Sequence, residues 1–293
     1  MVTDMKPRLR RLSRLIAIGT LTLLARCAPV DLLNATIHGD DVTVIRDIPY
    51  MPGPRGGMDV YRPTQAAGPL PVVVFFYGGA WQTGKRQDYL FAATELARRG
   101  MVVVVPDYRV FPEVQFPVFL QDSAIALALV HKSAATWGGD PHRVIVAGHS
   151  AGAWIAAMLA VDPQWLAAAG DSREALAGMV GLAGPYDFLP ITGEDIKAVF
   201  ATAPDKTLTQ PITYADGRNP PMLLLAGEAD DTVYPRNSLS LANRIRANGG
   251  PVTVKTYPGI GHIGIVISLA PLFRTKAPAL ADMADFILAL PSR

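Results

Sequence analysis

The chain has 293 residues, of which 50% are hydrophobic and 18% charged, with a formal net charge of +2 and one cysteine. This composition excludes a disordered chain, and one cysteine excludes a disulfide framework or a cysteine-rich metal site. The first 26 residues hold six Lys or Arg against one Asp, so the remainder is net negative. We therefore expect no nucleic-acid partner, which would require a basic face on the folded domain.

The N-terminal segment has the pattern of a targeting signal. Basic residues up to Arg14 precede an apolar run at 15–25, which has about half the ~20 residues that a bilayer-spanning helix needs. Cys27 follows directly, which resembles bacterial lipoprotein signals, although Arg26 replaces their usual small residue. We expect export, to the periplasm or to a membrane through a lipid on Cys27; the alternatives are an uncleaved anchor helix or an ordinary signal with an incidental cysteine.

Three segments are expected: a signal at residues 1–26, a tether at 27–40 and a single catalytic domain at 41–293. In the domain, short apolar or β-branched runs predict strands at 41–48, 58–61, 72–76, 101–105, 144–147, 179–183, 222–225 and 252–257. Helices are predicted between and after them at 88–99, 116–136, 151–161, 236–248 and 276–290. This alternation predicts an α/β fold with a mostly parallel sheet covered on both faces. Residues 191–217 lack a clear period and are expected to form an insertion that helps to shape a pocket.

The run GHSAG at residues 148–152 is the strongest chemical signal. It follows a predicted buried strand and precedes a predicted helix of small residues, which is the context that gives G-x-S-x-G its meaning. Such a serine sits on a sharp turn at a helix N-terminus, where free N–H groups and the helix dipole favour developing negative charge. Ser150 is therefore the candidate nucleophile.

A serine hydroxyl needs a base to remove its proton, and the base needs a carboxylate to orient it. Of the five histidines only His262 follows Ser150, as the order serine, acid, histidine requires. His262 lies in a glycine-flanked run after the last predicted strand, where a mobile but aimed base is expected. His149, beside the serine, is expected to be structural, because successive side chains point apart at such a turn.

The carboxylate is expected in the run GEADD at residues 227–231, where a predicted strand ends in an acidic turn. Its role would be to hold the imidazole tautomer and to stabilise the imidazolium as it forms. Glu228, Asp230 and Asp231 all compete for this role, and spacing alone does not separate the two aspartates.

Four motifs together resemble those of α/β-hydrolases of the esterase/lipase branch, which includes hormone-sensitive-lipase-like and feruloyl- or acetyl-esterase-like proteins. They are YGGAW at 77–81, DYR at 107–109 with the Pro-Glu and Phe-Pro pairs that follow, GHSAG at 148–152, and GEADDTV at 227–233 with His262. They extend over about residues 40–290. The resemblance implies the α/β-hydrolase fold, and the family pattern G-x-x-D-x-x-V implies Asp230 as the catalytic acid.

The resemblance also implies an oxyanion hole made by three backbone N–H groups, those of Gly79, Ala80 and Ala151. The family usually has His where this chain has Tyr77, but backbone donors do not depend on that side chain, so the hole is expected to persist. Trp81 and Tyr186 are candidate substrate-binding walls, although aromatic side chains are more often core. Arg109 is expected to pair with a buried carboxylate such as Asp122 instead of contacting substrate.

The sequence thus predicts a serine carboxylesterase that acts on small to medium carboxylic esters through an acyl-enzyme. No metal or organic cofactor is expected, because the acidic residues show no ligand spacing and no phosphate-binding loop is present. Two alternatives remain open at this point. One is an amide hydrolase, arylformamidase-like or peptidase-like, with the same triad; the other is an inactive lipoprotein that uses the cleft only to bind a ligand.

Overall fold

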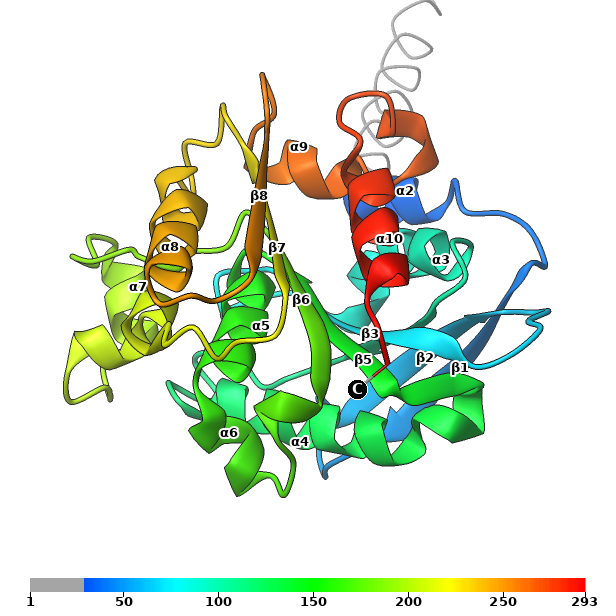
Figure 1. The fold of residues 1–293 in the computed structure, drawn as a ribbon, viewed down its shortest axis with the longest axis horizontal. Coiled ribbons are helices and arrows are strands. Elements are labelled where there is room, and N and C mark those ends of the chain that lie inside the picture. Colours follow the sequence, from blue (N-terminus) through cyan, green and yellow to red (C-terminus); the bar gives the residue numbers. More distant parts are fainter. Residues whose placement is uncertain (1–28, 293) are drawn as a thin grey trace, which may run out of the picture.

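The computed structural model describes residues 29–292 (Figure 1). The predicted signal, its junction with the tether and Cys27 lie outside the described residues. One eight-stranded sheet organises the domain, in the spatial order β1-β2-β4-β3-β5-β6-β7-β8. Its strands are β1 (Val42–Pro49), β2 (Gly57–Pro63), β3 (Leu70–Phe76), β4 (Val102–Pro106), β5 (Gly139–His149), β6 (Leu176–Leu182), β7 (Met222–Gly227) and β8 (Val252–Tyr257).

Only the first two strands depart from a parallel arrangement. β1 pairs antiparallel with β2, and β2 pairs antiparallel with β4, whereas every other neighbouring pair is parallel. The prediction of eight strands in a mostly parallel sheet is therefore confirmed. β4 lies on one side of β3 and β5 on the other. Right-handed connections therefore place the helix before β4 and the helix before β5 on opposite faces of the sheet.

Helices cover both faces of this sheet. α3 and α10 lie on one face, and α4, α5 and α8 on the other (Figure 1). The helices of the described residues are α2 (Pro29–Asn34), α3 (Leu90–Ala97), α4 (Val118–Ser133), α5 (Ala151–Val161), α6 (Pro163–Ala168), α7 (Glu194–Val199), α8 (Arg236–Ala247), α9 (His262–Ile267) and α10 (Ala279–Ala289). The single turns of 3-10 helix are η1 (Arg86–Tyr89), η2 (Ala134–Trp137), η3 (Arg173–Ala175), η4 (Lys206–Thr209), η5 (Pro211–Tyr214) and η6 (Pro271–Phe273). In the part of the chain that the structure describes, every helix is too short or too polar to cross a bilayer.

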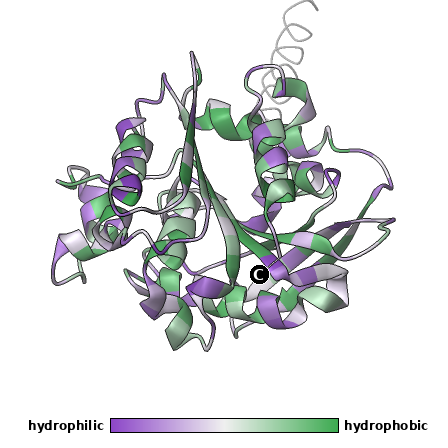
Figure 2. Cartoon of the chain, in the orientation of Figure 1, coloured by the Kyte–Doolittle hydropathy of each residue, from purple (hydrophilic) through white to green (hydrophobic). Residues whose placement is uncertain are grey.

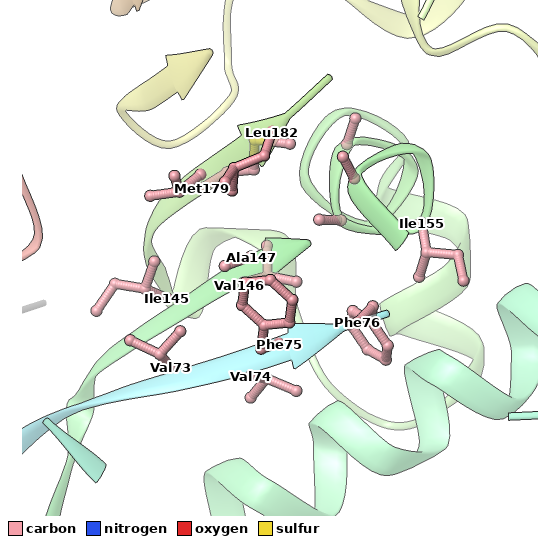
Figure 3. Close-up of a cluster of buried hydrophobic side chains, with 14 of the residues drawn as sticks. Val73, Val74, Phe75, Phe76, Ile145, Val146, Ala147, Ile155, Met179 and Leu182 are labelled. Carbon is pink, nitrogen blue, oxygen red and sulfur yellow. The ribbon is translucent and has the colours of Figure 1, made fainter. Parts of the chain in front are cut away.

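The core lies where the central strands meet α5. Hydrophobic residues concentrate on the central strands, and hydrophilic ones are more frequent in the outer helices and loops (Figure 2). Figure 3 shows side chains of β3, β5 and β6 packed together, and Ile155 of α5 beside them. α5 is apolar on all sides, which is why it is buried along its whole length. This burial fixes the helix whose first turn forms part of the site.

Two segments differ from the sequence-based expectation. Residues 191–217 contain α7, η4 and η5, and they pack against α5: the Trp154 indole N–H donates to the Thr209 carbonyl at 2.8 Å. None of these described residues lines the cavity beside Ser150 and His262, so the expectation that they shape that pocket is wrong. The region expected to be a tether contains α2, whose Leu33 is buried and lines that cavity.

The carboxyl ends of the parallel strands gather the chemistry-bearing residues. Ser150 follows β5, Asp230 follows β7 and His262 follows β8. Since these strands are parallel and close in the sheet, their ends meet at one edge, which is where ligands bind in open α/β sheets.

Candidate active site

Ser150 stands on a strained turn between β5 and α5. Its φ of 55° and ψ of −121° lie outside the regions that L-residues favour. The turn needs glycine on both sides: a Cβ on Gly148 would lie 2.3 Å from the Gly152 backbone, and one on Gly152 would lie 2.0 Å from the Phe76 carbonyl oxygen. The Ser150 N–H is tied to the Leu182 carbonyl at 2.9 Å. The hydroxyl is thereby presented at the N-terminus of a rigid, buried helix.

The His262 imidazole lies within hydrogen-bond distance of both expected partners. Its Nε2 is 2.9 Å from Ser150 Oγ, and its Nδ1 is 2.9 Å from Asp230 Oδ2. A carboxylate can only accept, so Nδ1 carries the proton and Nε2 is left to accept from the serine hydroxyl. His262 is the first residue of α9, one turn after β8 ends, so a helix fixes its backbone where a loop was expected.

Asp230 is the carboxylate that faces the imidazole. It is 3% exposed, and its Oδ1 accepts from the N–H groups of Thr232 at 3.0 Å and Val233 at 2.8 Å. Asp231 is exposed and contacts the Thr232 hydroxyl at 3.5 Å, while Glu228 is exposed and accepts from Thr256 at 2.8 Å. Of the three carboxylates that the sequence spacing could not distinguish, the structure thus places only Asp230 against His262.

The turn after β3 supplies backbone donors beside the serine. Gly79, Ala80 and Trp81 all have positive φ, at 127°, 53° and 58°. A Cβ on Gly79 would lie 2.3 Å from the Thr83 carbonyl oxygen, so this position requires glycine. Among residues 29–292, neither the Gly79 nor the Ala80 N–H has a hydrogen-bond partner. Together with the first N–H of α5, at Ala151, these groups are free to bind an anionic oxygen next to Ser150.

Tyr77 anchors this turn from below. Its ring stacks on Tyr108 with centroids 4.5 Å apart, and the Tyr108 hydroxyl donates to the Tyr77 carbonyl at 2.7 Å. Arg55 donates to the Tyr77 hydroxyl at 3.1 Å and to the Gly84 carbonyl at 3.0 Å, which ties both ends of the turn to one guanidinium. Burial raises the pKa of Tyr77, so the phenol stays neutral. These contacts hold the turn without the histidine that the family usually has there.

The site opens into a largely apolar cavity of about 870 Å³. Ser150 and His262 line it, together with residues of the turn after β3. Apolar residues of two helices form further walls: Val30 and Leu33 come from α2, and Ile263, Val266 and Ile267 come from α9. The short helices α2 and α9, which the sequence did not predict, therefore contribute apolar walls beside the serine.

Two predicted substrate-contacting residues lie elsewhere. Trp81 is 3% exposed and packs among Trp154, Phe188 and Phe200. Tyr186 is fully buried, and its hydroxyl occupies the space that a Cβ at residue 181 would need. Neither is among the described residues that line the cavity, so both predictions are corrected: these aromatic rings are core.

Other polar groups have structural roles. Arg109 and Asp122 form the expected bidentate pair, with N···O distances of 2.9 and 2.7 Å, and Asp122 is 1% exposed. His131 pairs with Asp171, and neither residue contacts the triad as described. Among residues 29–292, no group of three or more His, Cys, Asp or Glu side chains is placed to bind a metal ion.

Two further polar residues lie beside the triad: Tyr89, which the sequence analysis did not identify, and His149, which it expected to be structural. Tyr89, in η1, lines the cavity and lies 2.9 Å from His149 Nδ1. His149 is 2% exposed, and its Nε2 is 3.1 Å from the His262 carbonyl oxygen. No sequence pattern marks Tyr89, because only the fold brings η1 under the turn after β3.

This geometry fits one kind of chemistry. A hydroxyl that donates to a neutral imidazole, which is itself oriented by a buried carboxylate, can become a nucleophile without a free alkoxide. Unpaired N–H groups on the same side can stabilise an oxyanion. Acyl transfer through a serine is the reaction class that uses all of these groups at once.

Comparison with known proteins agrees with the geometry. Residues 58–245 match the model of the BD-FAE family. The chain is 29% identical over 249 residues to the probable isoprenylcysteine alpha-carbonyl methylesterase ICMEL1 of Arabidopsis thaliana, covering 76% of this chain and 52% of that protein. It is 29% identical over 241 residues to esterase LipC of Mycobacterium tuberculosis, covering 74% of this chain and 59% of that protein. The chain therefore spans about half to three-fifths of the length of these curated relatives.

Solved structures share the fold. Esterase B from Lactobacillus rhamnosis, solved with a phosphonate inhibitor, aligns with a TM-score of 0.75 at 19% identity, over 97% of this chain and 96% of its own. A truncated carbohydrate esterase from gut microbiota aligns with a TM-score of 0.72 at 21% identity, over 85% of this chain and 97% of its own. These likenesses establish the α/β-hydrolase fold for the described domain.

Proposed function

The chain belongs to the BD-FAE family, and we propose that it is a serine carboxylesterase. One observation carries the proposal: the hydrogen-bonded series from Ser150 Oγ through the His262 imidazole to Asp230, with 2.9 Å at each step. The unpaired N–H groups of the turn after β3 support it. So do the esterase names of the relatives, which are statements about those proteins and suggestions for this one.

In the first half of the reaction, Ser150 Oγ attacks the ester carbonyl carbon while His262 Nε2 takes the hydroxyl proton. The carbonyl oxygen becomes negative and accepts from the N–H groups of Gly79, Ala80 and Ala151. The ester C–O bond then breaks, His262 returns its proton to the leaving alkoxide, and an alcohol departs. The acyl group remains on Ser150 as an ester.

In the second half, water takes the place of the alcohol. His262 removes a proton from the water, whose oxygen attacks the acyl carbon with the same oxyanion donors in use. The bond to Ser150 Oγ breaks, and His262 returns the proton to the serine. Asp230 stays ionised throughout and stabilises the imidazolium that forms twice in each cycle.

We propose substrates of small to medium size. The cavity of about 870 Å³ is within the range of ordinary small-molecule sites, and its helical walls are apolar. An ester with a short or medium hydrocarbon group on one side of the carbonyl fits these walls better than a charged one does, because they offer few partners to a desolvated charge.

We propose also that the protein is exported and that Cys27 is lipidated. The support is the basic and apolar sequence before Cys27. Mass spectrometry of the mature N-terminus, after expression in a bacterial host, tests this. A diacylglyceryl cysteine at position 27 is the expected result, and an intact or differently cleaved N-terminus would contradict it.

The catalytic proposal is tested with purified wild-type, Ser150→Ala and Ser240→Ala proteins on p-nitrophenyl esters and matched anilides. Ser240, on α8, lines no part of the cavity as described and serves as the control. We expect Ser150→Ala to lose at least about 10³-fold in kcat/KM, since the nucleophile is gone, and Ser240→Ala to match wild type. Ester hydrolysis that survives in Ser150→Ala would overturn the proposal, and a preference for the anilide would reassign the enzyme as an amide hydrolase.

A further inference from the structure

Two polar side chains beside the triad have no part in the proton transfers described above. His149 is buried and Tyr89 is partly buried, and both lie between the turn after β3 and the backbone of His262. The Gly78 N–H is 3.1 Å from Tyr89 Oη, Tyr89 Oη is 2.9 Å from His149 Nδ1, and His149 Nε2 is 3.1 Å from the His262 carbonyl oxygen. Three hydrogen bonds thus join the residue before Gly79 to the residue that acts as base.

The direction of every bond in this series is determined by its ends. The His262 carbonyl can only accept, so His149 Nε2 must carry the proton. A neutral imidazole then has an unprotonated Nδ1, which accepts from the Tyr89 hydroxyl. The Tyr89 oxygen accepts from the Gly78 N–H at the other end. All donors therefore point one way, from the oxyanion turn to the base, and each bond polarises the next.

We propose that Tyr89 and His149 are positioning residues, which hold the oxyanion turn and the His262 backbone in register across Ser150. This inference rests on the proposed function of the same site. It assigns the two residues no proton transfer: they act through Gly78 on the adjacent oxyanion donors and through the His262 carbonyl on the imidazole.

Burial and ring packing support a fixed and neutral His149. Burial, helped by the nearby His262 ring, lowers the pKa of His149 to about 3, so it stays able to accept from Tyr89. Burial also raises the pKa of Tyr89, which keeps its hydroxyl proton. The two imidazole rings lie 4.9 Å apart at 38°, so His149 also limits tilting of His262.

The turn after β3 is also packed close to Ser150 and His149. A Cβ on Gly78 would lie 3.1 Å from both His149 Nδ1 and Ser150 Cβ, so little space separates the turn from the serine and the histidine. A shift of the turn would therefore displace His149, and through it the His262 backbone. Misplacement of reacting groups by about 1 Å costs on the order of 10²-fold in rate, so a weak structural tie at this place has a kinetic effect.

The test compares variants by kcat per active site, with active sites counted by fluorophosphonate titration so that unfolded molecules are excluded. His149→Leu removes both bonds, Tyr89→Phe removes the hydroxyl, and His149→Gln retains an amide N–H for the His262 carbonyl and an amide oxygen that can accept from Tyr89. We expect about a 10-fold loss of kcat for His149→Leu and for Tyr89→Phe, with KM changed less than about twofold, and recovery of most of the loss in His149→Gln. Tyr61→Phe, which alters a buried tyrosine of β2 outside the cavity lining, should match wild type.

The double variant Tyr89→Phe/His149→Leu decides whether the two residues act as one unit. If they do, the double variant loses no more than the larger single loss, about 10-fold; independent effects would multiply to about 100-fold and overturn the proposal. Unchanged kcat in the single variants would overturn it as well.

The rate of phosphonylation of Ser150 gives a second readout that needs no ester substrate. A wild-type protein that labels rapidly but hydrolyses no ester would refute the proposed function and leave the positioning role testable by the same variants. Equal labelling rates in wild type, His149→Leu and Tyr89→Phe would refute the positioning role alone.

Discussion

The His262 imidazole is held from three directions, and each contact fixes a different property of the ring. Asp230 fixes the tautomer through Nδ1, Ser150 occupies Nε2, and His149 packs beside the ring while binding the backbone. Asp230 itself is fixed by two backbone N–H groups on its other oxygen. A carboxylate constrained in this way cannot rotate to relieve a change in its partner.

This constraint makes Asp230→Asn a sharp test of the acid. The Asn Oδ1 is expected to keep the N–H groups of Thr232 and Val233, which leaves the amide NH₂ facing His262 Nδ1. The imidazole must then place its proton on Nε2, where it can no longer accept from Ser150. We expect kcat to fall by about 10³- to 10⁴-fold with little change in KM.

Asp231→Asn is the matched control, because its carboxylate is exposed and contacts only the Thr232 hydroxyl among its described partners. It should keep wild-type kcat/KM on a p-nitrophenyl ester. Equal losses in the two variants would contradict the assignment of Asp230.

Buried His149 also predicts an acid-sensitive fold. Its pKa is about 3 in the folded protein and about 6.5 in an unfolded chain. Between these values the unfolded chain binds the extra proton, so the free energy of unfolding rises with pH and falls on acidification. At pH 5, which is 1.5 units below the unfolded value, the loss from this one group is about 2 kcal/mol relative to neutral pH.

Urea unfolding at pH 7.5 and pH 5 measures this effect. Wild type should lose about 2 kcal/mol more than His149→Gln over this interval, because the variant has no imidazole to charge. His142→Gln, which removes an exposed histidine, controls for the loss of a ring as such. Identical losses in wild type and His149→Gln would rule out the buried neutral histidine.

At the scale of elements, the ends of three strands supply the reacting groups and two short helices supply the walls. The strand ends are rigid because their neighbours in the sheet hold them in register. α2 and α9 are single short helices whose apolar side chains face the cavity. Since His262 begins α9, that helix carries both the base and part of the wall, whereas α2 contributes to the wall alone. The α2 part of the wall can therefore be changed without altering the triad.

Leu33 on α2 tests this division. It is 8% exposed and lines the cavity, whereas its neighbour Leu32 is 68% exposed. Leu33→Phe should reduce kcat/KM for long-chain esters by about 10-fold relative to acetate esters, because the larger ring fills space that the chain needs. Leu32→Phe, on the outer side of the same helix, should leave the ratio unchanged.

The measurement uses two ester series, one lengthened on the acyl side and one on the alcohol side. A fall of the long-to-short ratio in one series identifies the group that lies against α2. An unchanged ratio in both series would show that α2 does not limit the substrate.

For the whole molecule, the sequence predicts the strands and a mostly parallel sheet, whereas the spatial order of the strands comes from the structure. Continuous apolar runs such as 72–76 predict strands buried on both faces, and the order of Ser150, Asp230 and His262 predicts that their strand ends converge. These features were predictable because each depends on a local pattern or on a motif with a fixed context.

The walls of the site could not be read in this way. Helices of six residues, such as α2 and α9, are too short to show a 3.6-residue period. Trp81 and Tyr186 are predicted as substrate-binding walls, but both rings are buried in the core. The contact between Tyr89 and His149 spans 60 positions in the chain, so only the assembled fold reveals it.

The central claim is that Ser150 becomes a nucleophile because His262 and Asp230 meet it at one edge of the sheet. Fluorophosphonate labelling followed by peptide mass spectrometry tests it most directly, using wild type, Ser150→Ala and His262→Ala. The account predicts one phosphonyl group per wild-type molecule, located on the peptide that contains Ser150, no label in Ser150→Ala, and labelling slowed by at least about 10²-fold in His262→Ala. A label on another residue, or labelling of His262→Ala at the wild-type rate, would contradict the claim.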